Sequence, residues 1–146
     1  MKMRVTKEFS FEASHALPDY DGLCSNIHGH SYRLFVSIKG IPSQDEQSPK
    51  YGMVIDFSSL KKIVQNEILD DFDHALVLRN DSLYASLLNN SGTKLLIVDY
   101  QPTCENMLQD FVGRISKKLP MEISLAEIKL YETATSYAQW LAEDNV

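Results

Sequence analysis

Residues 24–38 read CSNIHGHSYRLFVSI, and the later part of this stretch decides the fold. From 28 to 38, every second residue is a histidine or an apolar residue. The residues between them are small or polar, and Phe35 is the only exception. A period of two is typical of a β-strand with one buried face. Residues 5–15, VTKEFSFEASH, alternate in the same way and end on His15. The sequence therefore predicts two half-buried strands, joined by a loop.

Two helices are indicated by apolar side chains that recur every three or four residues. The first follows Asp56, which can cap a helix, and its apolar stripe is Phe57, Leu60, Val64 and Ile68. The second opens at Pro102 and Thr103, and its stripe is Leu108, Phe111, Val112, Ile115 and Leu119. Each stripe is one-sided, so both helices are expected to cover one face of a sheet.

The remaining segments complete this sheet and its connections. Residues 125–133 alternate as a third strand, 136–141 are expected as a last short strand or turn, and 94–99 can form an additional short strand. Two polar stretches, 42–52 and 80–92, are interpreted as surface loops. The order strand, strand, helix, helix, strand, strand predicts an α+β fold with an antiparallel sheet.

The composition is that of an ordinary globular chain. Its 146 residues fit one domain, 1–146, with 44% apolar and 23% charged side chains. Only two cysteines are present, Cys24 and Cys104, so a reducing cytoplasm is expected. A net charge of -6 without a run of Lys or Arg argues against a nucleic-acid partner. No apolar stretch approaches the roughly 18 residues that span a membrane, so no membrane partner is expected.

Three of the four histidines are predicted to meet at one rim of the sheet. His28 and His30 are two residues apart on a strand, so their rings project from the same face. If the first two strands pair as an antiparallel hairpin, His15 adjoins them. Three imidazoles with an open fourth position are the ligand set of a catalytic zinc site. The alternative, three histidines satisfied by ordinary hydrogen bonds, does not explain their convergence.

Cys24 and the Asp73–His74 pair are further reactive groups. Cys24 lies four residues before His28, beside the predicted metal. The residues alone leave it three roles: a fourth zinc ligand, a general base or nucleophile, or a loop cysteine. Asp73 can orient the His74 imidazole, although neighbours in sequence need not face each other.

Two glutamates are candidates for ligand binding. Glu132 ends a strand face that otherwise carries Ala126, Ile128 and Leu130. A carboxylate there costs free energy unless it is paired, either with a Lys or Arg of the protein or with a ligand that donates two parallel N–H groups. Glu105 lies in the first turn of the second predicted helix, where the helix dipole already favours a negative charge.

Six sequence strings resemble the superfamily of 6-pyruvoyltetrahydropterin and 6-carboxytetrahydropterin synthases. They follow the family order over nearly the whole chain: FSFEASHAL (9–17), CSNIHGHSY (24–32), VIDFSSLK (54–61), DFDHALVL (71–78), PTCEN (102–106) and KLYETAT (129–135). The resemblance implies the tunnelling fold (T-fold), in which sheets from three subunits join into a barrel and two rings stack as a homohexamer. It also implies Zn²⁺ on His15, His28 and His30.

The same resemblance implies a role for each remaining candidate. Cys24 becomes a catalytic acid–base residue, with Asp73 and His74 as the other proton-transfer pair. Glu132 would accept two hydrogen bonds from the guanidine-like edge of a pterin, and Glu105 is a weaker substrate-binding candidate. The implied chemistry is that of a zinc-dependent lyase with a small-molecule pterin triphosphate as its substrate.

The spacing of Cys24 and His28 favours one branch of the superfamily. Three residues separate them, as in the bacterial synthases of queuosine (7-deazaguanine) biosynthesis. Those enzymes convert 7,8-dihydroneopterin triphosphate to 6-carboxytetrahydropterin, acetaldehyde and triphosphate. Two alternatives remain: a pyruvoyl-type synthase, which eliminates triphosphate but keeps the carbon skeleton, and a noncatalytic zinc-binding module. The stretch 79–100 is longer than in compact bacterial members, and no basic motif marks a triphosphate site.

Overall fold

Strands β1 (Met3–His15) and β2 (His28–Gly40) form the centre of a six-stranded sheet in the computed structural model, which describes residues 1–146. The two strands pair antiparallel in an unbroken register, from Met3 opposite Gly40 to His15 opposite His28. This is the predicted hairpin. Its connection contains a short 3-10 turn, Leu23–Ser25.

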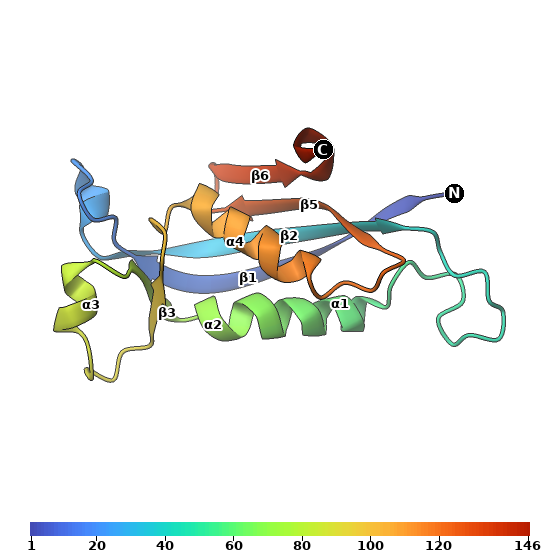
Figure 1. Cartoon of the computed structure of the whole chain (residues 1–146), viewed down its shortest axis with the longest axis horizontal. Helices are drawn as coiled ribbons and strands as arrows, with labels where there is room; N and C mark the ends of the chain where they lie inside the picture. Colours follow the sequence, from blue (N-terminus) through green and yellow to red (C-terminus); the bar gives the residue numbers. More distant parts are fainter.

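The full strand order is β4 (Leu95–Val98), β3 (Ala75–Arg79), β1, β2, β5 (Ser124–Tyr131) and β6 (Tyr137–Leu141). The α+β class is confirmed. The predicted antiparallel pairing is found between β1 and β2, β2 and β5, and β5 and β6. It is wrong for β3, which runs parallel to both β1 and β4. The chain enters β3 from a helix that follows the direction of β1 (Figure 1). Strand β3 was missed because its first four residues are all buried, which leaves no alternation to detect.

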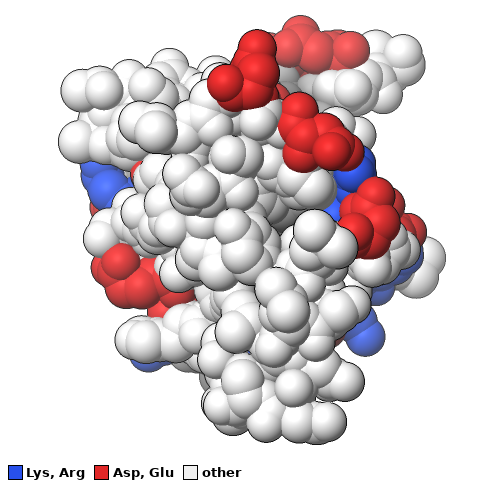
Figure 2. Space-filling view, turned by 90° about the vertical axis from the view of Figure 1, so that its left-hand side faces the viewer, with Lys and Arg blue, Asp and Glu red and all other residues white.

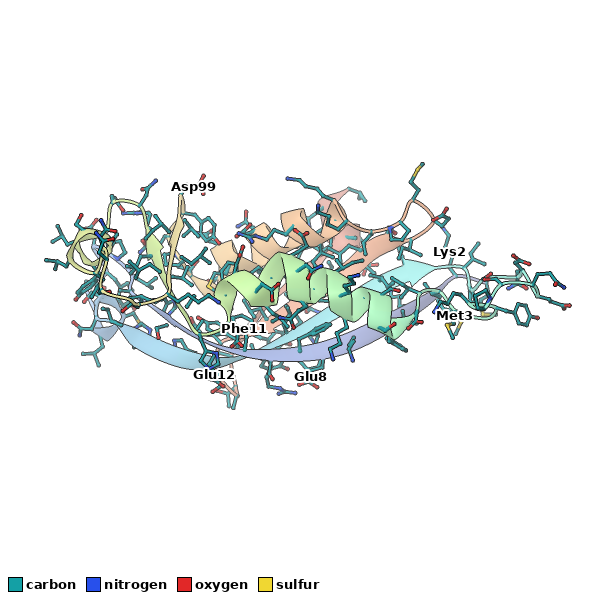
Figure 3. The ribbon with its side chains drawn as sticks, turned by 90° about the horizontal axis from the view of Figure 1, so that it is seen from below. Lys2, Met3, Glu8, Phe11, Glu12 and Asp99 are labelled. Atoms are coloured by element: carbon teal, nitrogen blue, oxygen red, sulfur yellow. The ribbon has the colours of Figure 1, made fainter.

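Both predicted helices lie on one face of the sheet (Figures 1 and 3). In the first, α1 (Phe57–Val64), a π-helical turn (Gln65–Leu69) and α2 (Asp70–Phe72) follow one another without a break. Its cap is Asp56, which accepts a hydrogen bond from the Ser58 N–H at 2.9 Å. The second helix, α4 (Cys104–Ser116), is capped by Thr103, which accepts from the Asn106 N–H at 3.2 Å.

The core fills the space between the sheet and these helices. Phe11 stacks on Tyr32 with ring centroids 4.9 Å apart and meets Phe111 edge-on at 6.1 Å. Figure 3 shows Phe11 on the helix side of β1, whereas Glu8 and Glu12 lie on the other side. The sheet therefore has an apolar face, covered by helices, and an uncovered polar face.

The segment 80–92 is more ordered than the predicted surface loop, because it contains a short helix, α3 (Leu83–Leu87). The predicted loop at 42–52 has no helix or strand, and a 3-10 turn (Ala142–Asn145) ends the chain. None of the helices has the length and apolar character that crossing a membrane requires.

One end of the molecule carries exposed apolar side chains from α3 and from the loop between β1 and β2. We call this set the apolar end; it consists of Tyr20, Leu23, Ile27, Leu83 and Leu87. Leu23 is 86% exposed and Leu83 80%. Figure 2 looks at this end and shows that most of its centre carries no charged side chain.

Candidate functional site

The structure brings the three predicted histidines together where β1 ends and β2 begins. In the β1–β2 register His15 lies opposite His28, and His30 follows on the same face of β2. One nitrogen from each ring lies within 4.8 Å of the other two. The Nε2 atoms of His15 and His28 are only 2.9 Å apart.

Backbone carbonyls fix the orientation of two of these rings. The Nδ1–H of His15 donates to the Pro102 carbonyl at 2.7 Å, and that of His28 donates to the Asn26 carbonyl at 2.8 Å. Because a carbonyl can only accept, each neutral ring keeps its Nε2 lone pair free. Two lone pairs 2.9 Å apart repel each other unless a cation lies between them. The His30 Nε2 atom is also buried without a hydrogen-bond partner, so all three nitrogens fit a bound metal ion.

Burial also keeps these rings in the form that binds metal. Desolvation lowers the pKa of His15 to about 4, although the hydrogen bond to Pro102 opposes this shift. Desolvation likewise lowers the pKa of His30, against the opposing attraction of Glu132. A neutral imidazole is the state that coordinates a metal. The three nitrogens could therefore hold a divalent metal ion.

Glu132, the residue after β5, faces this cluster. Its Oε1 atom lies 3.6 Å from Nε2 of His15 and 3.7 Å from Nε2 of His30. These distances are too long for hydrogen bonds, and no Lys or Arg pairs with the carboxylate. Glu132 and Glu105 border one small cavity of about 110 Å³, next to Cys104. The carboxylate of Glu132 is therefore free to accept hydrogen bonds from a ligand in this cavity.

Asp73 and His74 lie together, but on the face of the sheet opposite to the one that carries the histidine cluster. The Asp73 Oδ1 atom is 3.0 Å from Nδ1 of His74 and accepts the Glu12 N–H at 3.0 Å. Glu12 alternates with Ala13, whose side chain is buried, so Glu12 belongs to the uncovered face. His74 and Glu12 border a second cavity, of about 340 Å³, and the His74 side chain is 76% exposed. His30 also lines this cavity, but within one chain neither Asp73 nor His74 contributes an atom to the group of converging nitrogens.

Cys24 also stays outside the cluster. It is half-buried in the 3-10 turn between β1 and β2, and its carbonyl accepts the Leu17 N–H at 2.9 Å. Its sulfur does not belong to the group of converging ligand atoms. The fourth-ligand role is therefore not supported, and the acid–base role stays a prediction.

The supporting carbonyls of Pro102 and Asn26 were not found by sequence reasoning. Pro102 is 87 positions from His15, and a backbone carbonyl leaves no signature in the residue type. Asn26 is only two residues before His28, and a short turn before a ligand strand is a signal that could have suggested it.

The fold is shared with solved structures that have little sequence identity to this chain. An uncharacterised protein of Wolinella succinogenes aligns with a TM-score of 0.80 at 17% identity, covering 97% of this chain and 99% of that one. The 6-pyruvoyl tetrahydropterin synthase of Caenorhabditis elegans aligns with a TM-score of 0.67 at 23% identity, covering 97% and 96%. The sheet with its one-sided helices is thus the T-fold seen in pterin synthases.

Sequence comparison gives the family. A family model described as 6-pyruvoyl tetrahydropterin synthase matches residues 4–143. The chain therefore belongs to the 6-pyruvoyl tetrahydropterin synthase family, a family of enzymes, as the sequence strings indicated.

Two curated relatives carry a more specific name. The 6-carboxy-5,6,7,8-tetrahydropterin synthase of Haemophilus influenzae is 38% identical over 141 residues, which cover 94% of this chain and 97% of the relative. The protein of the same name from Synechocystis is 40% identical over 131 residues, which cover 79% and 98%.

Proposed function

We propose that this protein is a zinc-dependent 6-carboxy-5,6,7,8-tetrahydropterin synthase, a cytoplasmic lyase of queuosine biosynthesis that uses residues 1–146 as one domain. It converts 7,8-dihydroneopterin triphosphate and one water molecule to 6-carboxytetrahydropterin, acetaldehyde and triphosphate. The observation that carries this proposal is the convergence of three imidazoles beside the Glu132 carboxylate, which no Lys or Arg pairs. The relatives of that name add support, because they match over most of the chain.

His15, His28 and His30 would hold the zinc. When bound, the ion supplies a Lewis acid for the side-chain hydroxyls of the substrate. The protein prepares these ligands in advance, because burial favours the neutral forms of His15 and His30, and the Pro102 and Asn26 carbonyls orient the rings of His15 and His28. Three protein ligands leave a position open for substrate. A structural zinc module would instead need a fourth protein ligand, and Cys24 does not supply one.

Glu132 would orient the pterin. Its carboxylate can accept hydrogen bonds from the ring N–H and the amino group at the same time, which is the stronger, charge-assisted arrangement. Glu105 borders the same cavity and is the weaker candidate. The cavity of about 110 Å³ suits the edge of a ring better than a whole substrate.

Cys24 and His74 would transfer protons, with Asp73 holding the His74 imidazole. Cys24 belongs to the loop that joins His15 to His28, so it would serve its own cluster. His74 occupies the other face of the sheet, so it would serve the cluster of a neighbouring subunit. A catalytic site assembled from two chains accounts for this separation.

The edges of the sheet support such an assembly. Strand β1 pairs with β3 only over Ala13–His15, and the Asp73–His74 turn bonds the backbone of Glu12, which leaves residues 3–11 without a strand on their outer edge. Strand β6 is the other edge. If β1 of each copy pairs with β6 of the next, three copies would close into a barrel without free edges. Such closure avoids uncontrolled strand pairing. Two rings that pack through the apolar end (Figure 2) would complete a homohexamer, a dimer of trimers.

Product identification tests the proposed reaction. The zinc-loaded protein is incubated with 7,8-dihydroneopterin triphosphate, and every product is identified by mass. We expect acetaldehyde, triphosphate and 6-carboxytetrahydropterin. Triphosphate with a pyruvoyl pterin and no acetaldehyde would assign the protein to the pyruvoyl branch. No turnover by protein with stoichiometric zinc would favour a noncatalytic module.

A further inference from the structure

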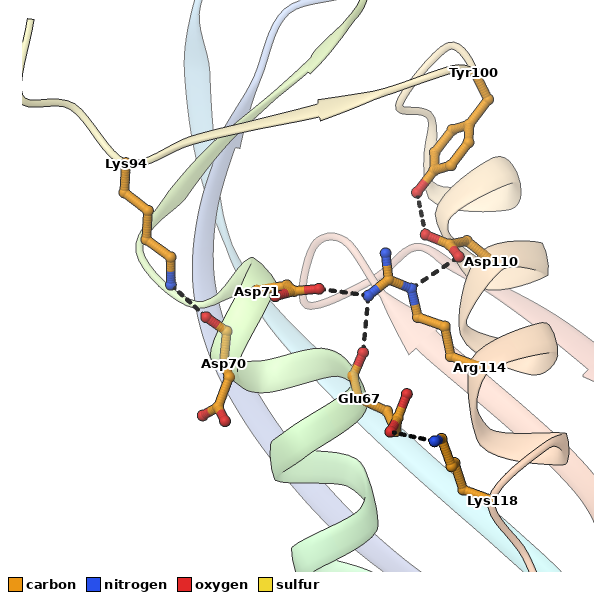
Figure 4. Close-up of polar contacts among 8 residues, drawn as sticks. All are labelled: Glu67, Asp70, Asp71, Lys94, Tyr100, Asp110, Arg114 and Lys118. Carbon is orange, nitrogen blue, oxygen red and sulfur yellow. Dashed lines mark hydrogen bonds and ion pairs between the residues drawn. The ribbon is translucent and has the colours of Figure 1, made fainter. Parts of the chain in front are cut away.

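Lys94 reaches from the start of β4 to the end of the first helix. Its Nζ donates to the carbonyl oxygens of Asp70 and Asp73, both at 2.7 Å; Figure 4 shows the contact with Asp70. Its own carbonyl accepts the Leu76 N–H at 2.9 Å, so its backbone is anchored on β3. Lys94 therefore joins the end of the 80–94 segment to both sides of the Asp73–His74 turn.

The Asp73 carbonyl belongs to the peptide unit that links Asp73 to His74. Its oxygen is held by Lys94, while the N–H of the same unit, that of His74, donates to the Glu12 carbonyl at 2.6 Å. The plane of this peptide is thus fixed from two sides, by the end of a long segment and by a central strand.

His74 needs such support because its backbone is unusual. Its φ of 62° lies in the left-handed region, which is strained for a residue with a side chain and persists only where the surroundings hold it. The ring is 76% exposed, so the core does not position it. The position of the imidazole therefore depends on the Asp73 carboxylate and on the peptide that Lys94 holds.

We propose that Lys94 is a positioning residue for the proton-transfer step: by fixing the Asp73–His74 peptide, it holds the left-handed turn that presents the His74 imidazole. This role rests on the function proposed above for His74. The end of the long 80–94 segment would then contribute to the reaction, because Lys94 supports the position of His74.

A matched pair of substitutions isolates this contact. Lys94→Met keeps the length of the side chain but removes its donors, so the Asp73 carbonyl turns to water and the peptide can rotate. Lys118 is the control, because it pairs with Glu67 on the same helix at 3.7 Å but does not touch the turn (Figure 4). Lys118→Met is expected to leave kcat within about twofold of the parent, as for an exposed ion pair.

The expected change in Lys94→Met is in kcat and not in KM. Displacement of a proton-transfer group by about 1 Å can cost on the order of a hundredfold in rate. We therefore expect acetaldehyde release to slow by about tenfold or more, with KM within about twofold. Lys94→Arg, which restores donors to the two carbonyls, should recover most of the loss. An unchanged kcat in Lys94→Met, or an equal loss in Lys118→Met, would overturn the proposal.

A double-variant cycle separates positioning from general destabilisation. Residues that act through one group are not additive, so Lys94→Met should slow the His74→Ala protein by less than about twofold. A full loss in that background would show that Lys94 acts elsewhere and would overturn the proposal.

Failure of the proposed function can be distinguished from failure of this inference. If the parent releases no acetaldehyde, the function is wrong, and amide hydrogen exchange of His74 then decides the role of Lys94. Faster exchange in Lys94→Met than in Lys118→Met, by about tenfold, is expected if Lys94 secures this peptide. Equal exchange in the two variants would overturn the inference.

Discussion

The Oε1 atom of Glu132 lies 3.6 Å from Nε2 of His15, although β2 separates the strands that carry them. His15 ends β1, and Glu132 follows β5. The Glu132 carboxylate and the His15 imidazole, a candidate metal ligand, thus face the same small space from two different strands of the sheet. A ligand that fills this space can contact the metal and the carboxylate together.

Glu132→Gln should weaken pterin binding while the fold and the zinc are kept. A carboxamide has one acceptor and one donor group. One of the two hydrogen bonds to the pterin is therefore replaced by a repulsive contact between two donors. We expect a loss of about 1.5–3 kcal/mol of binding free energy, measured by calorimetry with a nonreacting pterin.

Glu127→Gln is the matched control for this substitution. Glu127 lies on β5 but faces Lys129 and Gln139 on the uncovered side of the sheet. Pterin binding equal to that of the parent in Glu132→Gln would contradict the proposed role, and loss of zinc would assign the carboxylate to support of the metal site.

The metal-free protein should lose stability as the pH falls from about 6.5 to about 4. Burial lowers the pKa of His15 to about 4, so within this range the unfolded chain binds the proton more readily than the native one. The native state is therefore favoured above this range, and the contribution of His15, at most about 3 kcal/mol, is lost through it. Urea unfolding at several pH values measures the change.

His15→Gln provides the comparison for this pH dependence. The carboxylates titrate in both proteins, so the difference between their slopes isolates His15. A variant with the same slope as the parent would show that His15 is not held neutral in the native state.

Arg114→Met should destabilise the packing of α4 on the first helix. The Arg114 guanidinium donates to the Asp71 carboxylate at 2.6 Å, the Glu67 carbonyl at 3.0 Å and the Asp110 carboxylate at 2.9 Å (Figure 4). We expect the free energy of unfolding to fall by about 2 kcal/mol, the scale for half-buried charged hydrogen bonds. Lys118→Met, at an exposed pair of the same region, should change it by less than about 0.5 kcal/mol. Similar losses in the two variants would argue against a special role for Arg114.

Leu83→Glu, and separately Leu23→Glu, should convert the proposed hexamer into trimers. Both side chains belong to the apolar end, and a charge there opposes burial between rings. Light scattering coupled to size-exclusion chromatography gives the mass directly. Met121→Glu, at a fully exposed methionine outside the apolar end, should leave the hexamer intact. A parent protein that is monomeric at micromolar concentration would contradict the whole assembly.

The central hairpin and its histidines could be predicted because one periodic signal controls both. Alternation along 5–15 and 28–38 gives the strands, and the same alternation puts His15, His28 and His30 on one face. The starts of the two helices, at Asp56 and Thr103, could also be predicted, because capping depends on the type of the capping side chain.

The parallel strands of the sheet, and the backbone contacts that hold the site residues in place, could not be predicted from the sequence. Strand β3 is buried on both faces, and its pairing with β1 depends on the path of the preceding helix. The face on which His74 lies depends on that pairing. The Pro102 carbonyl and the Lys94 contacts join segments far apart in sequence, and their chemistry is that of the backbone.

Anomalous diffraction at the zinc edge, from crystals of the zinc-loaded protein, tests whether the three histidines hold the metal. We predict one strong peak at about 2.0–2.1 Å from the Nε2 atoms of His15, His28 and His30, with no fourth protein ligand. A zinc ion bound by His28 and His30 but more than about 4 Å from His15, or one closed by the Cys24 sulfur, would contradict it.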